Sequence, residues 1–419
     1  MPGLGETLAG VIPASAALAV PAAGQAPAGL PSCALVDLDA IAANVGVLRR
    51  AAGGAAVMAV VKADGYGHGM LPAAQAALRG GADWLGVAQL GEALQVRAAG
   101  IRAPLLAWLT VPGDRFTEAV AAGVDIGVGA GWTVDEVAAA AAASGVAARV
   151  HLKVDTGLAR GGCRAADLPD LLAALLRHEA AGTLRLVGLF SHLACSDTPA
   201  HPSVEAQVAA FTAAVEVAER AGARLELRHL ANSAATLAVP QARFDAVRPG
   251  VALYGLSPIP DLATSADLGL RPAMSLLGRV AMVKDVPAGQ GVSYGLTYVT
   301  PAPTTLALIP LGYGDGVPRH AGGVGPVLLN GHRVPIAGRV CMDQVVLDLG
   351  GHDAGVRVGD VAVLFGAGRH GEPTAQDWAE AAGTISYEIV TRIGGRVPRH
   401  YIGTQAGTVE AAGPTAAAR

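Results

Sequence analysis

A lysine closes one of the most apolar runs in the sequence. Residues 56–61, AVMAVV, lead directly into Lys62, and a glycine-rich segment, ADGYGHG, follows at residues 63–69. A lysine at the end of a buried strand has two familiar uses: its desolvated amine forms a Schiff base, or its charge binds a phosphate. The glycines would let a bulky planar ligand or a phosphate approach the backbone closely.

Further polar residues end other apolar runs along the first two thirds of the chain. They are Lys153, His192, Asn232 with Ser233, and Arg248 with Gly250. When parallel strands close into a barrel, the active site lies at their carboxyl ends. The sequence therefore predicts a single site that brings these side chains together with Lys62.

Eight apolar runs alternate with helical patterns between about residue 33 and residue 260. The first is AAVMAVV at residues 55–61, the last is VALYG at residues 251–255, and Ala-rich amphipathic segments such as residues 204–222 lie between them. Continuous apolar strands covered by helices are typical of parallel sheets. We predict an α/β fold, a (β/α)8 TIM barrel. An open doubly wound sheet is the alternative, which is disfavoured because no GxGxxG motif follows the first strand.

The composition and patterning of the sequence change after about residue 270. Pro, Gly and Thr become more frequent there, and short strand-like runs with alternating apolar and polar residues replace most helical patterns. Asn330-Gly331 between two strand-like runs indicates a two-residue hairpin turn. One helical pattern remains, at residues 374–383. We therefore predict a mostly β, largely antiparallel C-terminal domain. The predicted parts are a flexible extension at 1–32, the barrel at 33–268, the β-rich domain at 269–404 and a flexible tail at 405–419.

Composition and charge exclude several classes of protein. The 419 residues carry a formal net charge of −4 and no run of Lys or Arg, which argues against nucleic acid and anionic membranes as partners. The four cysteines form no CxxC pair, so we expect no metal site and no disulfides, and a reduced cytoplasmic setting fits. No apolar stretch reaches the ~20 residues of a transmembrane helix. Glu6, with no basic residue before the apolar part, argues against a signal peptide.

Eight segments, in order and with sensible spacing, carry a family resemblance. Over about residues 33–403 the sequence resembles the alanine racemase family in AVVKADGYGHG, LKVDTGLARGG, HLANSAA, VRPGVALYG, GVSYGLTY, IPLGYGDGVPR, GRVCMDQVVLDL and SYEIVTRIGGRVPRHY. The resemblance implies a barrel that carries pyridoxal 5'-phosphate (PLP), a β-rich C-terminal domain and a head-to-tail homodimer. It also implies interconversion of L-alanine and D-alanine, which would supply D-alanine for peptidoglycan.

The resemblance assigns the residues around the cofactor. Lys62 would hold PLP as a Schiff base and then act as one of two bases. His192 would stack on the pyridine ring, and Arg248 would face the ring nitrogen with support from His229. Because a guanidinium donates hydrogen bonds but does not hand over a proton, this nitrogen would stay largely unprotonated. The remaining cofactor-binding residues would be Tyr66, Asn232, Ser233 and Tyr387, with the backbone at Gly250 and Val251.

The resemblance also requires a second subunit. Racemisation removes a proton from one face of Cα and delivers one to the other, so a second base must stand opposite Lys62. Tyr294, contributed by the partner subunit, would be that base. Arg160 would lie near this tyrosine and the substrate carboxylate, and a carbamate on Lys153 would orient Arg160. A plain lysine there would be a like-charge neighbour of Arg160.

By the same resemblance, residues 341–343 would reach the pocket from the partner subunit. The backbone amide of Met342 would bind the substrate carboxylate, with Cys341 and Asp343 beside it. Cys341 lies in an apolar run, so we expect a packed thiol rather than a nucleophile. Tyr313 would narrow the entrance.

Three other functions stay open on the sequence. A broad-specificity amino-acid racemase is the nearest, although Tyr387 and Tyr313 would keep the side-chain pocket short and favour alanine. A PLP-dependent amino-acid decarboxylase shares the architecture, but Tyr294 and Arg248 speak against it. A PLP carrier without activity is disfavoured because the second domain also carries motifs of the site.

Overall fold

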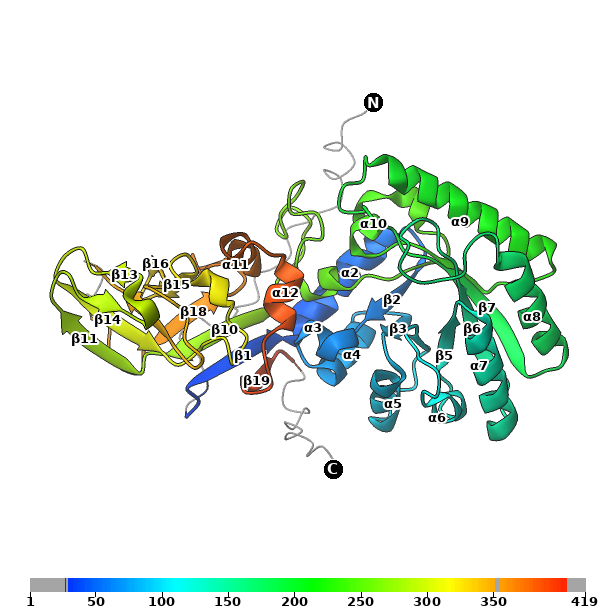
Figure 1. Cartoon of the computed structure of the whole chain (residues 1–419), viewed down its shortest axis with the longest axis horizontal. Coiled ribbons are helices and arrows are strands. Elements are labelled where there is room, and N and C mark those ends of the chain that lie inside the picture. Colours follow the sequence, from blue (N-terminus) through cyan, green and yellow to red (C-terminus); the bar gives the residue numbers. More distant parts are fainter. Residues whose placement is uncertain (1–26, 28, 351–354, 405–419) are drawn as a thin grey trace.

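The computed structural model describes residue 27 and residues 29–350 and 355–404. These residues form two lobes, one in which helices surround a group of strands and one built mainly of strands (Figure 1). Most of the predicted N-terminal extension and all of the predicted tail lie outside the described residues. Within the described part of the chain, no helix is long and apolar enough to cross a membrane.

Eight parallel strands close into a barrel in the first lobe. They are β2 (Ala56–Val60), β3 (Trp84–Val87), β4 (Leu105–Ala107), β5 (Asp125–Val128), β6 (Ala148–Lys153), β7 (Leu184–Phe190), β8 (Leu227–His229) and β9 (Ala246–Val247). Most residues of these strands are apolar and buried, as expected of a parallel sheet that helices cover. The predicted TIM barrel is confirmed, and the open-sheet alternative is wrong.

Helices follow the strands and cover the outside of the barrel (Figure 1). They are α2 (Leu38–Ala52), α3 (Lys62–Tyr66), α4 (Met70–Arg79), α5 (Leu90–Ala98), α6 (Phe116–Ala121), α7 (Gly131–Ser144), α8 (Leu168–Ala180), α9 (Pro202–Arg220) and α10 (Ser233–Ala238). Local chemistry sets several ends. The Asp37 side chain accepts the Ala40 N–H at the start of α2, and Gly53 ends that helix with a left-handed φ of 65°.

The eighth strand is not the one that the sequence indicated. The strand β9 contains only Ala246–Val247, and VALYG instead forms a 3-10 helix, η2 (Val251–Tyr254). The side chains of η2 are buried, and the Tyr254 hydroxyl donates to the Val60 carbonyl oxygen at 3.1 Å. A short apolar run does not by itself distinguish a buried strand from a buried helical turn, which is why the prediction for residues 251–255 was wrong.

The second lobe is built on a six-stranded sheet in the order β16-β15-β18-β10-β1-β19. Its strands are β1 (Ser32–Asp37), β10 (Met274–Arg279), β15 (Pro326–Leu329), β16 (His332–Pro335), β18 (Val361–Phe365) and β19 (Arg399–Ile402). All neighbouring pairs are antiparallel except β1 with β19. A mostly β, largely antiparallel second domain is therefore confirmed.

Strand β1 lies near the N-terminal end of the described chain but belongs to the sheet of the second lobe. It falls within the range 33–268 that the sequence assigned to the barrel, yet it pairs with β10 and β19 of the second lobe. The domain limits themselves stay predictions. Because β1 leads directly into α2 of the barrel, the two lobes share a continuous element at this point.

Smaller sheets and helices complete the second lobe. They are β11 (Met282–Val286), β14 (Thr304–Ile309) and β17 (Val345–Asp348) in one sheet, β12 (Gly291–Val292) and β13 (Tyr298–Val299) in another, and the helices η3 (Tyr294–Leu296), η4 (Arg319–Ala321), α11 (Ala375–Ala382) and α12 (Ser386–Thr391). The predicted hairpin joins β15 and β16, where Asn330 and Gly331 have φ of 49° and 84°, the pair of left-handed values that a type I′ turn requires. The sequence pattern found α11 but missed α12.

The helix α12 packs against α3 where the two lobes meet (Figure 1). Gly67 ends α3 with φ of 80°, and a Cβ atom there would lie 2.3 Å from the Val390 carbonyl oxygen of α12. Arg399 Nε donates to the Gly67 carbonyl oxygen at 2.9 Å from β19. Glycine at this position therefore sets how closely the second lobe approaches the Lys62 segment.

Replacing Gly67 by alanine should destabilise the junction between the lobes. The left-handed φ costs about 1–2 kcal/mol for a residue with a Cβ, and the collision with Val390 adds about 1–3 kcal/mol. Gly54→Ala is the matched control, because Gly54 also has a left-handed φ (101°) but nothing within 4 Å of its added Cβ. Thermal unfolding should show a clearly larger drop in midpoint for Gly67→Ala than for Gly54→Ala. Equal drops would mean that α12 yields freely and that Gly67 does not set the approach.

Candidate active site

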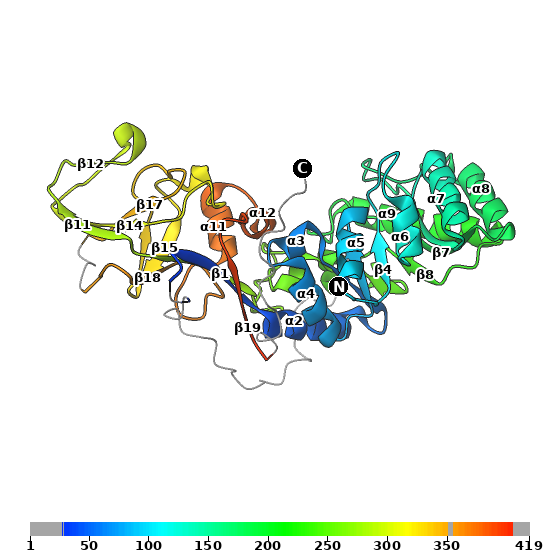
Figure 2. The same cartoon turned by 90° about the horizontal axis from the view of Figure 1, so that it is seen from below.

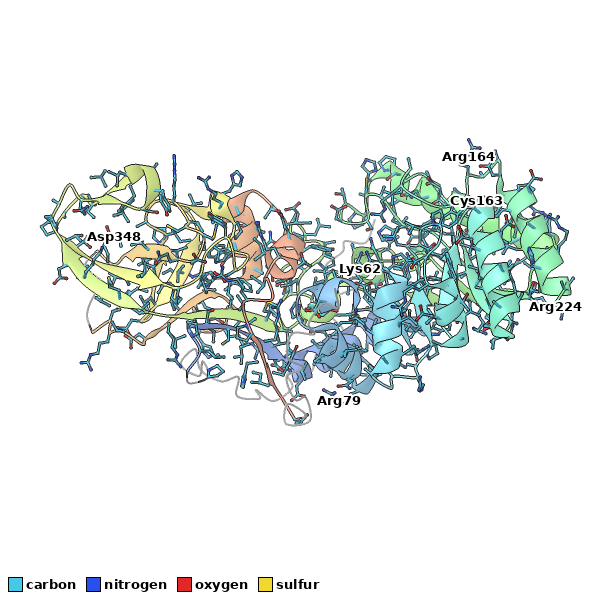
Figure 3. All side chains as sticks on the ribbon, turned by 60° about the horizontal axis from the view of Figure 1, so that its bottom comes forward. Lys62, Arg79, Cys163, Arg164, Arg224 and Asp348 are labelled. Carbon is cyan, nitrogen blue, oxygen red and sulfur yellow. The ribbon has the colours of Figure 1, made fainter. Side chains whose placement is uncertain are left out.

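A cavity of about 340 Å³ opens at the carboxyl ends of the barrel strands. Figure 3 shows Lys62 on the side of the barrel that faces the second lobe. Eleven residues expected in the site line this cavity together: Lys62, Tyr66, Lys153, Arg160, His192, Asn232, Ser233, Arg248, Gly250 and Val251 from the barrel and Tyr387 from α12. The volume is that of a pocket for a small organic ligand.

The chain takes an unusual path directly after Lys62. Ala63, Asp64 and Tyr66 have φ of 53°, 52° and 53°, so three residues with side chains adopt a left-handed conformation in one short turn. Each such residue costs about 1–2 kcal/mol, and a strained turn of this kind persists only where its surroundings hold it. The turn brings Lys62 and Tyr66 to the same cavity.

Two carboxylates hold this turn through backbone N–H groups. Glu92, on α5, accepts from the Ala63 N–H at 2.7 Å with one oxygen and from the Ala88 N–H at 2.9 Å with the other. Asp64 accepts from the Met70 N–H at 2.9 Å. Glu92 was missed in the sequence, where it looks like an ordinary N-terminal helix carboxylate, and only the fold shows that it clamps the Lys62 segment.

Positive charge dominates the cavity. Lys62, Lys153, Arg160 and Arg248 all line it. Burial is the largest cause that lowers the pKa of Lys62. The positive charge of Arg160 lowers it further, Glu92 opposes this shift, and Arg248 adds a smaller lowering effect. Burial and Arg160 lower the pKa of Lys153 in the same way. The cavity thus favours neutral amines and would attract ligands that carry negative charge.

One end of the cavity is shaped to take a compact polar group. The Ser233 hydroxyl accepts the backbone N–H of Gly250 at 2.8 Å and of Ala252 at 3.3 Å. A Cβ atom on Gly250 would lie 2.2 Å from the Tyr66 hydroxyl, so only glycine lets Tyr66 reach this point. Burial raises the pKa of Tyr66, which keeps its hydroxyl protonated and able to donate at neutral pH.

Arg248 is buried and tightly held. Its guanidinium donates to the carbonyl oxygens of His229 at 2.8 Å and Ser191 at 2.6 Å, and Nη1 lies 3.1 Å from His229 Nδ1. Burial lowers the pKa of Arg248 to about 9, which still leaves it a cation at neutral pH. His229 lies behind Arg248 and does not line the cavity, in keeping with the supporting position expected for it.

His192 and Tyr387 are neutral groups on the cavity wall. Burial and the nearby cations, Arg248 first, lower the pKa of His192 to about 3. Burial and Asp197 raise the pKa of Tyr387 to about 12. At neutral pH His192 therefore presents an uncharged ring suited to packing on a flat ligand, and Tyr387 presents a hydroxyl that can donate.

Sequence reasoning missed several residues that line the same cavity. They are Val60, Ala63, Trp108, Phe190, Ser191 and Thr391. Trp108 fills space that two glycines leave open, since a Cβ on Gly86 or Gly127 would come within 3.0 Å of it. Phe190 precedes His192 by two residues, a spacing that puts both on the same face of a strand, and this was the one available signal.

A second group of expected site residues lies away from this cavity. Tyr294, Tyr313, Cys341, Met342 and Asp343 all belong to the second lobe, and none lines the cavity of its own chain. Tyr294 is 71% exposed, Met342 52% and Tyr313 40%. Figure 2 shows the turn after β12, which carries Tyr294, projecting from the part of the second lobe far from the barrel.

These residues nevertheless lie close to one another. Backbone hydrogen bonds join Tyr313 N–H to the Cys341 carbonyl oxygen at 3.0 Å and Gly314 N–H to the Met342 carbonyl oxygen at 2.8 Å. Ser293, next to Tyr294, donates to the Arg339 carbonyl oxygen at 2.6 Å. The three segments thus form one surface of the second lobe, which we call the Tyr294 surface.

The Tyr294 turn is anchored from the side. The Tyr298 hydroxyl donates to Asp348 at 2.7 Å, and the Gly350 N–H donates to the same carboxylate at 2.9 Å. Figure 3 shows Asp348 within the second lobe, well apart from Lys62. The exposed side chain of Tyr294 therefore stands on a supported turn rather than on a free loop.

The cavity fits PLP by the chemistry of its walls. Lys62 offers an amine whose pKa is lowered. The backbone of Gly250 lies beside Ser233 and the Tyr66 hydroxyl, which a Cβ atom on Gly250 would displace, and these groups suit a phosphate. Arg248 can donate to a pyridine nitrogen, and His192 offers an uncharged ring to its face. Among the described residues, no group of three or more His, Cys, Asp or Glu side chains is arranged to hold a metal ion.

Comparison with known proteins places both lobes in one family. Family models described as "Alanine racemase, N-terminal domain" and "Alanine racemase, C-terminal domain" match residues 36–258 and 273–401. An alanine racemase of Thermobifida fusca is 60% identical over 370 residues, covering 88% of this chain and 98% of the relative.

Two solved structures are similar over almost the whole fold. The alanine racemase of Streptomyces coelicolor A3(2) is 55% identical, with a TM-score of 0.88 over 89% of this chain and 98% of that one. The alanine racemase of Bacillus anthracis with bound L-Ala-P is 36% identical, with a TM-score of 0.81 over 90% of this chain and 97% of that one. The chain therefore belongs to the alanine racemase family of isomerases.

Proposed function

We propose that the protein interconverts L-alanine and D-alanine with PLP as its cofactor. The observation that carries this proposal is the cavity in which Lys62, with a lowered pKa, stands among Lys153, Arg160 and Arg248. A phosphate and a substrate carboxylate would supply the negative charge that balances these cations. The relatives named alanine racemase, one of them with bound L-Ala-P, support the same reaction.

PLP, when bound, supplies the electron-accepting ring system that acidifies the Cα–H bond of the amino acid. The residues of the protein would hold and orient the cofactor and the substrate. Ser233, Tyr66 and Tyr387 would hold the phosphate, His192 would pack on the ring, and Arg248 would donate to the ring nitrogen. Because Arg248 stays a cation and does not transfer its proton, the ring nitrogen would remain largely unprotonated.

Two bases on opposite faces of Cα would move the proton. Lys62 is suited to accept a proton because burial and neighbouring cations favour its neutral amine. Tyr294 is the proposed second base, and Arg160, which lines the cavity, would favour its phenolate and bind the substrate carboxylate. Met342, through its backbone amide, would bind the same carboxylate, with Cys341 and Asp343 beside it.

Lys153 is proposed to carry a carbamate. Its lowered pKa favours the neutral amine, which can attack carbon dioxide to form a C–N bond with loss of a proton. The resulting anion would lie among Arg160, Lys62 and Arg248 in place of another cation. Replacing a positive charge by a negative one at Lys153 would hold the Arg160 side chain in place and reduce the repulsion between like charges in the cavity.

The proposed enzyme is a head-to-tail homodimer with shared sites. Tyr294 lies on an exposed, supported turn and does not reach the cavity of its own chain. The Tyr294 surface also exposes the large apolar side chains of Leu296, Met342 and Tyr313, which are 62%, 52% and 40% exposed. Packing this surface over the cavity of a second subunit would bury them and bring both bases to one substrate.

The cellular role and specificity belong to the same proposal. Tyr387 on the cavity wall and Tyr313 from the partner subunit would leave room for a methyl side chain and exclude longer ones. A cytoplasmic enzyme of this kind would supply D-alanine for peptidoglycan. The alternatives are broad-specificity racemisation and PLP-dependent decarboxylation. The first experiment below distinguishes both from alanine racemisation.

The direct test is chiral analysis of L-alanine incubated with the protein and PLP in deuterated buffer. We expect D-alanine that carries deuterium at Cα, with little product from L-serine or L-lysine run in parallel. Lys62→Ala is the control and should give neither deuterium exchange nor D-alanine. Equal product from all three substrates would show broad specificity, and carbon dioxide with an amine would show a decarboxylase.

Shared sites can be tested by mixing two inactive variants. A dimer of one Lys62→Ala subunit and one Tyr294→Phe subunit would contain one damaged site and one site in which both bases are intact. After random subunit exchange, mixing should restore roughly a quarter of wild-type activity. Mixing Lys62→Ala with Arg160→Ala is the control, because both residues line the cavity of one chain and no intact site can form. Absence of recovery in the first mixture, with exchange verified, would contradict the shared site.

A further inference from the structure

A chain of hydrogen bonds runs from Arg248 away from the cavity and through the inside of the barrel. Arg248 Nη1 lies 3.1 Å from His229 Nδ1, and His229 Nε2 lies 2.9 Å from His151 Nδ1. His151 Nε2 lies 3.1 Å from Asp125 Oδ2. Both imidazoles are completely buried, and Asp125 is 4% exposed. We call these four residues the relay.

The barrel geometry places the relay. Alternate residues of β6 point to the same side, so Arg149, His151 and Lys153 form one row. Lys153 lines the cavity, His151 lies one step deeper, and Arg149 lies at the far end, where it binds Asp125. Space for the His151 ring depends on Gly188, since a Cβ there would lie 2.1 Å from His151 Nδ1.

The two ends of the relay fix every proton between them. An arginine side chain only donates and a carboxylate only accepts, whereas a neutral imidazole has one donor and one acceptor. Because Arg248 can only donate, His229 Nδ1 must accept a hydrogen bond from it. The proton of the neutral His229 ring is therefore on Nε2, which donates to His151 Nδ1. His151 must then carry its own proton on Nε2 and donate it to Asp125. A second proton on either imidazole would set donor against donor, and burial and Arg248 also lower the pKa of His229.

We propose that Asp125 and His151 are positioning residues for the active site, which act through His229 to hold Arg248 in a single donating orientation toward the cavity. This inference rests on the proposed function only in assigning the PLP ring nitrogen as the group that Arg248 meets. The relay would keep the Arg248 contact short and invariant through the reaction. Neither Asp125 nor His151 touches the cavity.

The burial of Asp125 supports a directed role for its charge. A carboxylate removed from water is costly unless all its acceptor positions are used. Arg149 Nε lies 3.1 Å from both oxygens of Asp125, and His151 Nε2 lies 3.1 Å from Oδ2, so both oxygens have a partner. An asparagine at this position has one oxygen, so either Arg149 or His151 would face an NH₂ group. If the NH₂ group faces His151, His151 must reverse its tautomer, and the reversal passes to His229 and ends with two donors facing each other at Arg248.

The first test needs no variant. In protein labelled with ¹⁵N at histidine, the imidazole nitrogen shifts report which nitrogen carries the proton. His151 and His229 should both be neutral and protonated at Nε2, before and after PLP is added. A proton on Nδ1 of His229, or a doubly protonated ring at either residue, would overturn the relay.

The second test measures the consequence at the cofactor. Asp125→Asn should lower kcat by about tenfold, the lower end of what losing an outer hydrogen-bond partner costs at histidines that bind metals. KM for alanine should change by less than about twofold, because Arg248 meets the cofactor and not the substrate. The ¹⁵N shift of PLP labelled at its ring nitrogen should move relative to that of the wild-type protein.

Glu226→Gln is the matched control for this variant. Glu226 pairs with Arg149 at 3.0 Å and with Arg185 at 2.5 Å, at the same end of the barrel, but touches no member of the relay. It should leave kcat and the ring-nitrogen shift unchanged. Wild-type values for Asp125→Asn, or the same losses in Glu226→Gln, would show a structural role only. Failure of the wild-type protein to bind PLP would instead overturn the proposed function, and the histidine tautomers would still decide on the relay.

Discussion

Repulsion between like charges in a buried cavity is the constraint on which the site depends. Lys62, Lys153, Arg160 and Arg248 line one space of about 340 Å³. Burial first, and then the charges of Arg160 and Arg248, lower the pKa of both lysines. Such a cluster is unfavourable until anions enter it. A phosphate, a substrate carboxylate and a carbamate on Lys153 would each relieve part of the repulsion. The same environment would suit Lys62 to its proposed role as a base, so that binding and reactivity would share one origin.

The second lobe is related to this constraint in two ways. It contributes Tyr387 to the cavity of its own chain through α12, which Gly67 allows to approach the Lys62 turn. It also carries the Tyr294 surface, whose exposed side chains do not line the cavity of the same chain. A barrel that binds the cofactor but holds only one base is incomplete for racemisation. In the proposed dimer, catalysis would therefore depend on assembly as well as on folding.

Much of this could be predicted because the sequence marks strand ends clearly. Lys62, Lys153 and Arg248 each follow an apolar run, and parallel strands bring such ends together. The β9 strand was misplaced because two residues are too few to show a pattern, and VALYG was as apolar as a strand.

Other parts of the site had no local signal. Trp108 and Phe190 look like core residues, and their place on the cavity wall depends on glycines in neighbouring strands. The contacts of Asp125 and His151 join separate strands across the barrel, so no spacing along the chain reveals them. The residues of the Tyr294 surface could be identified only by family resemblance, since nothing in their own segments indicates a partner.

The proposed reaction requires that Lys62 bind the cofactor covalently, and the lysine content of the chain allows a sharp test of this attachment. It contains only three lysines, Lys62, Lys153 and Lys284, and the first two line the same cavity. Borohydride reduction of the PLP-loaded protein, followed by peptide mapping, would show which lysine carries the reduced cofactor. We expect the label on Lys62 alone. A label on Lys153, or on neither cavity lysine, would rule out Lys62 as the site of attachment.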